Sequence, residues 1–140
     1  MRVIIVGAGP AGLYTAIALK RARPDLEILV VEQNPADVTF GFGVVFSRQA
    51  LTFLRKDDPS TADLIDPHMK HWSDITVIHA GQRITIDGIG FSGIGRLKLL
   101  ELLQNRARAL HIEPEYGTLI DVSTDLSDFD LIIGADGFNS

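Results

Sequence analysis

The sequence opens with Arg2-Val3-Ile4-Ile5-Val6-Gly7-Ala8-Gly9-Pro10-Ala11-Gly12, and the fold class follows from this run. Residues 3–6 are continuously apolar, which is typical of a strand buried in a parallel sheet. Gly7 suits a tight turn after the strand, Gly9 lets a diphosphate approach the backbone, and Gly12 lets a helix pack closely on the strand. Free amide groups at the start of that helix attract phosphates. The run therefore predicts a dinucleotide-binding fold.

A second apolar run, residues 28–31, ends in Glu32, which lies 20 residues after Gly12. A dinucleotide fold places a carboxylate at this spacing to bind a ribose diol. Glu32 could instead simply end the strand and face water, but the complete glycine run and the preceding strand favour the cofactor interpretation. Gln33 and Asn34 follow, with no arginine to receive a 2′-phosphate, so the site suits FAD or NAD better than NADP.

Composition limits the classes of function. The chain has 140 residues, 46% of them hydrophobic, and its 13 basic and 18 acidic side chains give a formal net charge of −5. This length predicts one domain, and this charge argues against a nucleic-acid or anionic-membrane partner. The absence of cysteine excludes disulfides, iron–sulfur clusters and a cysteine nucleophile. We expect a cytoplasmic protein, because a strand that begins at Arg2 leaves no room for a cleavable leader.

The middle of the chain predicts a series of short elements. Ser47 is an expected N-cap, and Asp57-Asp58-Pro59 is expected to end that helix with a solvated acidic pair. The full series is a loop over 34–46, a helix after Ser47, a turn at 66–67, a β-hairpin over 75–86 around Ala80-Gly81, a permissive glycine-rich stretch over 88–95, a helix over 97–109, and strands over 112–116 and 130–134. His68 and His71 lack a third ligand by spacing, so no metal site is predicted.

A second glycine motif, Gly134-Ala135-Asp136-Gly137, comes directly after the last predicted strand. Asp-Gly is a common turn pair by itself. Its place at the carboxyl end of a buried strand is nevertheless where α/β folds bind ligands.

The two glycine motifs, together with Arg96-Leu97-Lys98-Leu99-Leu100-Glu101-Leu102-Leu103, resemble the N-terminal part of the single-component FAD-dependent aromatic hydroxylases, the group of para-hydroxybenzoate hydroxylase. That family combines the first glycine run, an arginine that opens a leucine-rich helix, and the Asp-Gly motif. The leucines here fall at several neighbouring positions, so the helix register departs from the family pattern.

Three further segments resemble the branch of this family that acts on aryl-CoA thioesters, which includes salicylyl-CoA 5-hydroxylases and 2-aminobenzoyl-CoA monooxygenases. They are residues 39–47, His71-Trp72-Ser73-Asp74-Ile75 and Gly90-Phe91-Ser92-Gly93-Ile94-Gly95-Arg96. Violacein-pathway hydroxylases share the Gly-x-Gly-Val-Val element, so the reaction class is better defined than the substrate.

The resemblance implies a Rossmann-like α/β fold with a parallel sheet, helices on both faces and a small β-hairpin. It also implies FAD as cofactor, NADH or NADPH as co-substrate, and an aromatic small molecule as substrate, with a CoA thioester as one form. Reduced flavin in this family takes up O2 to form a C4a-hydroperoxide that hydroxylates the ring, so the cofactor carries the chemistry. No catalytic side chain is assigned.

The resemblance also assigns site residues. Arg96 corresponds to the arginine that reaches FAD near its ribityl and diphosphate portion, although by itself it would pass for an exposed residue at a helix start. Gly43 and Val44 correspond to a loop beside the flavin ring. The complete set of predicted cofactor-binding residues is Gly7, Gly9, Pro10, Ala11, Gly12, Glu32, Gln33, Gly43, Val44, Arg96, Asp136 and Gly137.

Family members contain a later Gly-Asp motif and an antiparallel sheet that covers the substrate. Neither is found in residues 1–140, which we therefore expect to be a fragment of the FAD-binding domain with little or no turnover by itself. Two alternatives stay open: another flavoenzyme of the same fold, such as a reductase, dehydrogenase or halogenase, and a nucleotide-binding module without catalysis. The choice between NADH and NADPH and the oligomeric state also stay open.

Overall fold

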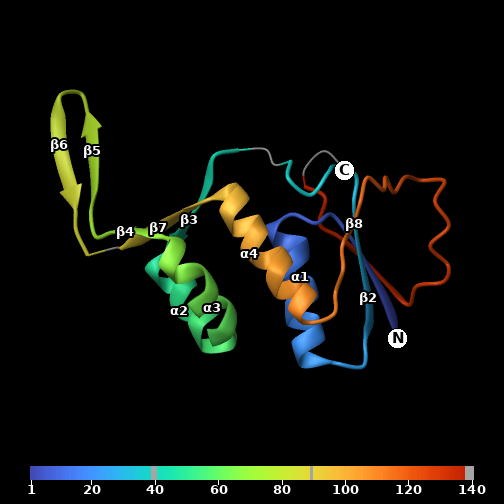
Figure 1. Ribbon diagram of the computed structural model, residues 1–140. Coiled ribbons are helices and arrows are strands. Elements are labelled where there is room, and N and C mark those ends of the chain that lie inside the picture. Colours follow the sequence, from blue (N-terminus) through green and yellow to red (C-terminus); the bar gives the residue numbers. More distant parts are fainter. Residues whose placement is uncertain (39–40, 89, 138–140) are drawn as a thin grey trace. The chain divides into compact units, whose positions relative to one another are not determined.

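The computed structural model describes residues 1–38, 41–88 and 90–137. The chain divides into two compact units (Figure 1). Unit 1 contains residues 1–39 and 100–140, and unit 2 contains residues 40–99. Helix α4 (Arg96–Ala109) begins in unit 2 and ends in unit 1. The single FAD-binding domain expected from sequence stays a prediction.

Unit 1 is built on a four-stranded parallel sheet. Its strands are β1 (Arg2–Val6), β2 (Glu27–Glu32), β8 (Glu115–Tyr116) and β9 (Leu131–Gly134), in the order β8-β2-β1-β9. Side chains from both faces of the inner strand β1, those of residues 3–5, are at most 1% exposed. A strand that is buried on both faces needs a continuous apolar sequence, which explains the run at its centre.

Two helices accompany this sheet. Helix α1 (Pro10–Ala22) has Pro10 in its first turn, where no amide hydrogen is needed, and α4 buries the predicted leucine side and Ala107. The connections β1–α1–β2 and β2–α4–β8 step across the sheet in the same direction, so the right-handed rule places both helices on one face. Figure 1 agrees with this placement, and the expected α/β fold with a parallel sheet and helices is confirmed. Among the described residues, no helix is both long and apolar enough to cross a bilayer.

Unit 2 contains a three-stranded antiparallel sheet, ordered β3-β7-β4. Its strands are β3 (Gly43–Ser47), β4 (Lys70–Trp72) and β7 (Phe91–Gly95). Between them the chain forms α2 (Arg48–Asp57), α3 (Pro59–Ile65) and the short 3-10 helix η1 (Asp66–His68). On β7, Ser92 and Ile94 are buried whereas their neighbours are more exposed, so the two faces of the sheet differ.

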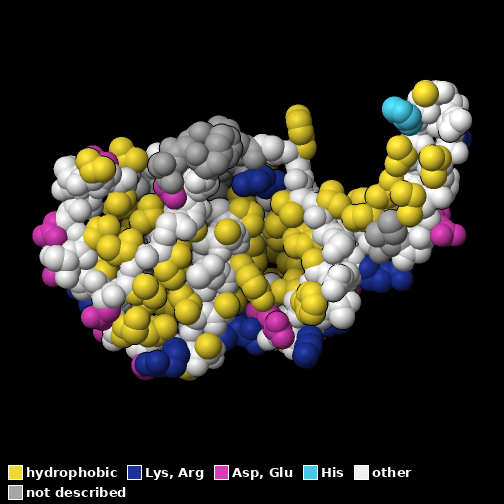
Figure 2. Space-filling view, turned by 180° about the vertical axis from the view of Figure 1, so that it is seen from behind, with side chains coloured by type: hydrophobic (Ala, Val, Ile, Leu, Met, Phe, Trp, Pro, Cys, Tyr) yellow, Lys and Arg dark blue, Asp and Glu magenta, His cyan; other side chains and the backbone are white. Residues whose placement is uncertain are grey.

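The predicted hairpin is confirmed as β5 (Ile75–His79) and β6 (Gln82–Ile86). Ala80 and Gly81 both have positive φ values, 48° and 77°, as a tight type I′ turn requires. Hydrophobic side chains are exposed along this hairpin (Figure 2), namely Val77, Ile78, Ile84 and Ile86.

Three strands of unit 2 were not predicted. β3 occupies the end of the expected loop over 34–46, β7 occupies the expected permissive stretch over 88–95, and β4 falls where no element was expected. β7 has three glycines or serines among five residues, a composition that disfavours strands locally. Its pairing with β3 and β4 is a long-range interaction, and it overrides that local preference. The predicted strand over 112–116 is confirmed only for its last two residues.

The prediction for Asp57-Asp58 is wrong in part, because Asp58 is fully buried. One oxygen of its carboxylate accepts a hydrogen bond from the Thr61 amide at 3.1 Å, and the other accepts from the Thr61 hydroxyl at 2.6 Å. Asp58 therefore caps a second helix, α3, that begins at Pro59. The predicted cap at Ser47 is confirmed, since its hydroxyl accepts from the Ala50 amide at 3.1 Å.

We predict that Asp58→Ala destabilises unit 2 by about 1–3 kcal/mol, because it removes a helix cap and leaves a buried hydroxyl unsatisfied. The exposed Asp74→Ala is the control, and we expect it to change stability by less than about 0.5 kcal/mol. Urea unfolding followed by the fluorescence of Trp72, the single tryptophan of the chain, reports on this unit. Equal midpoints for the two variants would show that the Asp58 cap contributes nothing.

Candidate functional site

The first glycine turn and the second glycine motif lie next to each other at the carboxyl edge of the unit 1 sheet. β1 and β9 are parallel neighbours, with Val6 opposite Gly134. The Ala135 amide donates to the Val6 carbonyl oxygen at 2.7 Å, and the Gly7 amide donates to the Val31 carbonyl oxygen at 2.7 Å. These bonds join the ends of β2, β1 and β9, although the two motifs are more than a hundred residues apart in sequence.

Gly7 is required by this close approach. Its φ is 108°, in the region that favours glycine, and a Cβ there would lie 2.5 Å from the carbonyl oxygen of Ala135 and 2.7 Å from the amide nitrogen of Asp136. No side chain fits between the two backbones. The predicted turn at Gly7 is present, and its neighbour across the gap is the Asp-Gly motif.

Gly12 and Gly9 differ in what surrounds them. A Cβ on Gly12 would overlap the carbonyl oxygen of Gly7, so glycine is required where α1 crosses the end of β1. A Cβ on Gly9 would meet no protein atom within 4 Å. The space beside Gly9 is therefore open, and it lies at the N-terminus of α1, where free amides favour an anion. This arrangement fits the diphosphate of a dinucleotide.

Glu32 is held in place by its neighbours. One carboxylate oxygen accepts from the Ala8 amide at 3.0 Å, and the other accepts from the Asn34 amide and side chain at 2.9 and 2.7 Å. The side chain is half-buried rather than facing water, which was the alternative considered from sequence. A carboxylate has about four acceptor positions, so these three bonds leave capacity for a ribose hydroxyl.

Sequence reasoning missed the residues that orient Glu32. The Ala8 amide ties the carboxylate to the glycine turn, and Asn34 holds it from the far side. The signal available was the Asn-Pro pair just after the strand, because asparagine there commonly bonds to nearby groups.

Tyr116 lies opposite Glu32 in the β2–β8 pairing. Burial is the largest influence on this phenol and raises its pKa, while Arg108 opposes the rise and the charges of Glu32 and Glu113 add to it. The phenol therefore stays protonated at neutral pH beside the Glu32 carboxylate.

The remaining unit 1 candidates border the same edge. Pro10 and Ala11 form the first turn of α1, Gln33 is exposed just after β2, and Asp136 and Gly137 are exposed after β9. Gly137 has a φ of 96°, so the chain turns there as the motif predicts. The structure thus brings together the nine candidates of unit 1: Gly7, Gly9, Pro10, Ala11, Gly12, Glu32, Gln33, Asp136 and Gly137.

The other three candidates belong to unit 2. Gly43 and Val44 lie at the start of β3, opposite Gly95 and Ile94 of β7, and so form part of a strand rather than a loop. Arg96 opens α4, its amide donates to the Phe42 carbonyl oxygen at 3.2 Å, and its Cδ would be 3.9 Å from a Cβ on Gly41. Gly43, Val44 and Arg96 are therefore neighbours at one end of the unit 2 sheet.

Within residues 1–38, 41–88 and 90–137, no group of three or more histidine, aspartate or glutamate side chains is placed to hold a metal ion.

Comparisons with known proteins agree with the resemblance inferred from sequence. The chain is 44% identical over 140 residues to a salicyloyl-CoA 5-hydroxylase of a Streptomyces species, covering all of this chain and 27% of that protein. It is 31% identical over 140 residues to the 3-hydroxy-4-methyl-anthranilyl-[aryl-carrier protein] 5-monooxygenase of Streptosporangium sibiricum, of which it covers 39%. The chain thus spans well under half the length of these relatives.

A solved structure gives the same result for the fold. A mutant of 2-methyl-3-hydroxypyridine-5-carboxylic acid oxygenase superposes with a TM-score of 0.81 at 25% sequence identity, over 99% of this chain and 40% of that one. The predicted resemblance to aromatic hydroxylases, and to their aryl-CoA branch, is confirmed. The lycopene cyclase protein family matches residues 2–127, which is most of the sequence. By that match the chain belongs to the lycopene cyclase protein family.

Proposed function

We propose that residues 1–140 are the FAD-binding part of a flavin-dependent monooxygenase that hydroxylates an activated aromatic ring, with NADH or NADPH as reductant. One observation carries the cofactor assignment: the glycine turn, the Glu32 carboxylate and the Asp136-Gly137 turn meet at one edge of a parallel sheet. The similarity to two ring-oxygenating relatives supports the reaction class. A cytoplasmic location remains a prediction from sequence.

Each unit 1 residue has a binding role in this proposal. The open backbone at Gly9 and the first amides of α1 receive the diphosphate, because they offer donors without a side chain in the way. Glu32 receives the adenosine ribose through the acceptor capacity that its bonds to Ala8 and Asn34 leave free. Asp136 is exposed beside the Gly7 turn, where its carboxylate would contact the bound cofactor.

We also propose cofactor contacts for three residues of unit 2, on the resemblance to the family. Arg96 offers a planar guanidinium for the oxygen-rich ribityl and diphosphate portion. Gly43 leaves backbone accessible at the start of β3, and its neighbour Val44 adds an apolar side chain. Bound flavin supplies the redox chemistry and the activation of O2. The protein binds the cofactor, orients the substrate and excludes water from the site.

The substrate class comes from the relatives. One is named for a salicyloyl-CoA and the other for an anthranilyl group on an aryl-carrier protein, so both act on an aromatic acid activated as a thioester. We propose an aryl thioester for this protein as well. Because the chain spans 27% and 39% of these relatives, the proposal extends to a protein of which these residues are one part.

The family match provides a specific reason to keep a second candidate. A cyclase on the same nucleotide fold would use the same dinucleotide site without transferring oxygen to a ring. Reductases, dehydrogenases and halogenases of this fold would likewise bind FAD without hydroxylating a ring. A non-catalytic nucleotide module would bind a dinucleotide without flavin chemistry. FAD binding separates the flavoenzymes from the module, and ring hydroxylation separates the monooxygenase from the other flavoenzymes.

We predict opposite effects for two glycine substitutions. Gly9→Val fills only open space, so we expect the fold to persist while FAD affinity falls at least about tenfold. Gly12→Val overlaps the Gly7 carbonyl, so we expect loss of the folded unit 1. Circular dichroism melts and quenching of flavin fluorescence measure the two properties. A folded Gly9→Val variant that binds FAD as tightly as the wild type would contradict the diphosphate site.

Glu32→Gln should weaken FAD binding by about tenfold to a hundredfold, because a charge-assisted hydrogen bond to the ribose is lost. Glu27→Gln, at the exposed start of the same strand, removes the same charge and is the control. Calorimetric titration with FAD and with riboflavin distinguishes the roles, since riboflavin has no adenosine ribose. If Glu32→Gln changed the two affinities equally, Glu32 would not be a ribose ligand.

The reaction class is tested by turnover. The FAD-loaded chain, given NADH or NADPH and salicyloyl-CoA, should show little or no coupled hydroxylation by itself, and robust hydroxylation would overturn the proposal that it is one part of the enzyme. A chimera in which these residues replace the corresponding part of the Streptomyces relative should bind FAD and hydroxylate. An FAD-loaded chimera that oxidises NADH or NADPH without hydroxylating any aryl thioester would favour another flavoenzyme class.

A further inference from the structure

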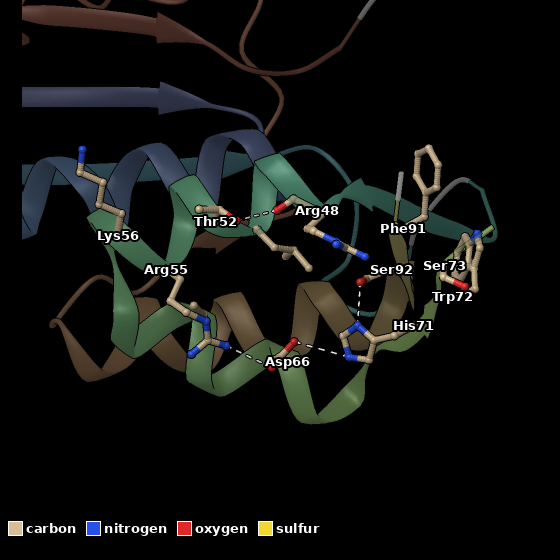
Figure 3. Close-up of a pocket in the computed structure, with 13 residues that line it drawn as sticks. Arg48, Thr52, Arg55, Lys56, Asp66, His71, Trp72, Ser73, Phe91 and Ser92 are labelled. Atoms are coloured by element: carbon tan, nitrogen blue, oxygen red, sulfur yellow. Dashed lines mark hydrogen bonds and ion pairs between the residues drawn. The ribbon is translucent and has the colours of Figure 1, made fainter. Parts of the chain in front are cut away.

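Unit 2 contains a groove of about 730 Å³ that none of the assignments above uses. Its walls are α2, the start of η1, β4 and the start of β7 (Figure 3). A volume of this size is in the range that small-molecule ligands occupy.

The groove is positively charged although the chain is acidic. Its lining includes three cationic side chains, Arg48, Arg55 and Lys56, and one carboxylate, Asp66. The chain as a whole has a formal net charge of −5. A local excess of positive charge on an acidic protein favours an anionic ligand at this place.

Arg48 is the cation that is held in place and still available. Its amide donates to the Gly90 carbonyl oxygen at 3.0 Å, and its guanidinium packs against Gly90, where a Cβ would lie 2.5 Å from Nε. Gly90 has a φ of 66°, so glycine there both makes the turn and leaves room for the guanidinium. Within the part of the chain that the structure describes, this guanidinium has no hydrogen-bond or ion-pair partner.

The other charged groups of the groove are largely satisfied by one another. Arg55 pairs with Asp63 at 2.7 Å and with Asp66 at 3.1 Å. His71 bonds to the Ser92 hydroxyl at 2.7 Å and lies 3.5 Å from the second oxygen of Asp66. Figure 3 shows Lys56 at the opposite end of α2 from Arg48. An incoming anion at the Gly90 end of the groove therefore meets Arg48 as its unpaired cation among the described residues, because Arg55 is shared by two aspartates and Lys56 lies at the other end of α2.

An aromatic pair borders the groove next to Arg48. Trp72 and Phe91 stack with ring centroids 6.2 Å apart at an interplanar angle of 21°, and Trp72 is 39% exposed. Trp72 also lies over Gly93, where a Cβ would be 3.2 Å from its ring. A ligand that combines a phosphate with an uncharged arm would meet the guanidinium and this apolar surface together.

We propose that this groove binds the phosphate and the adjoining pantetheine arm of the aryl thioester substrate, with Arg48 as the phosphate ligand. The proposal rests on the proposed function, because it is the aryl thioester that supplies the arm. CoA thioesters and carrier-protein thioesters share this phosphopantetheine group, which fits relatives named for each of them.

The position of the groove suits this role. Ser47, next to Arg48, and Gly43 are the two ends of β3, four residues apart. At a rise of about 3.4 Å per residue, they are separated by roughly 14 Å along the strand. An extended pantetheine arm spans that distance, so a phosphate at Arg48 allows the acyl end to reach the candidate flavin contacts at Gly43.

Calorimetry on the 140-residue chain tests the phosphate site. The probes are 4′-phosphopantetheine and pantetheine, which differ only in the phosphate, and the variants are Arg48→Gln and the control Arg83→Gln on the exposed hairpin strand β6. We expect the wild type and Arg83→Gln to bind 4′-phosphopantetheine about tenfold more tightly than pantetheine, and Arg48→Gln to lose that preference. Equal affinity for both probes in the wild type, or an unchanged preference in Arg48→Gln, would overturn the proposal.

Two further measurements complete the test. One compares CoA with a carrier protein as the source of the pantetheine arm, and the other tests the groove separately from the proposed function. CoA and a carrier protein bearing the phosphopantetheine group are titrated in parallel; tighter binding of either than of 4′-phosphopantetheine supports the groove and names the natural donor. FAD affinity is measured on the same variants and should not change in Arg48→Gln. FAD binding without phosphate preference would refute the groove alone, whereas phosphate preference without FAD binding would refute the proposed function alone.

Discussion

The structure depends on the close contact of three backbone segments at the carboxyl edge of one parallel sheet. Gly7, Gly12 and Ala135 approach so closely that a Cβ on either glycine would collide with backbone atoms. This contact places the first turn of α1 beside the ends of β1 and β9, and through the Ala8 amide it also fixes the Glu32 carboxylate. Steric exclusion of side chains therefore creates a surface of exposed amides next to an oriented acid. Each feature expected of a dinucleotide site follows from that one constraint.

The two units use different means to attract anions. In unit 1 the donors are backbone amides at a helix start, which need no positive side chain, so a chain with a net charge of −5 can still offer a diphosphate site. In unit 2 the attraction comes from side chains, with Arg48 held against Gly90 and Arg55 neutralised by two aspartates. The first arrangement suits a cofactor that is common to many enzymes. The second suits recognition of the phosphate group of a substrate, because side chains can differ among relatives without disturbing the fold.

Local sequence predicted unit 1 well and unit 2 poorly, for physical reasons. Strands β1 and β9 are apolar and short, and α4 has a strong leucine side. The local pattern of each therefore predicts where the element begins and ends to within a few residues. The glycine-rich β7 becomes a strand only because it pairs with β3 and β4, and the three-residue β4 only because it pairs with β7. Asp58 looked like a solvated acid because its partner, Thr61, serves a helix that was not predicted. The groove beside Arg48 could not be predicted, since its lining comes from elements that only the fold brings together.

The central claim is that the Gly7–Gly12 turn binds the diphosphate of FAD while Glu32 binds the adenosine ribose. A crystal structure of this chain grown with FAD tests it most directly. The account predicts diphosphate oxygens within hydrogen-bonding distance of the first amides of α1, and a ribose hydroxyl on the free acceptor position of Glu32. A structure in which FAD is bound elsewhere, with both of those positions filled only by solvent, would contradict it.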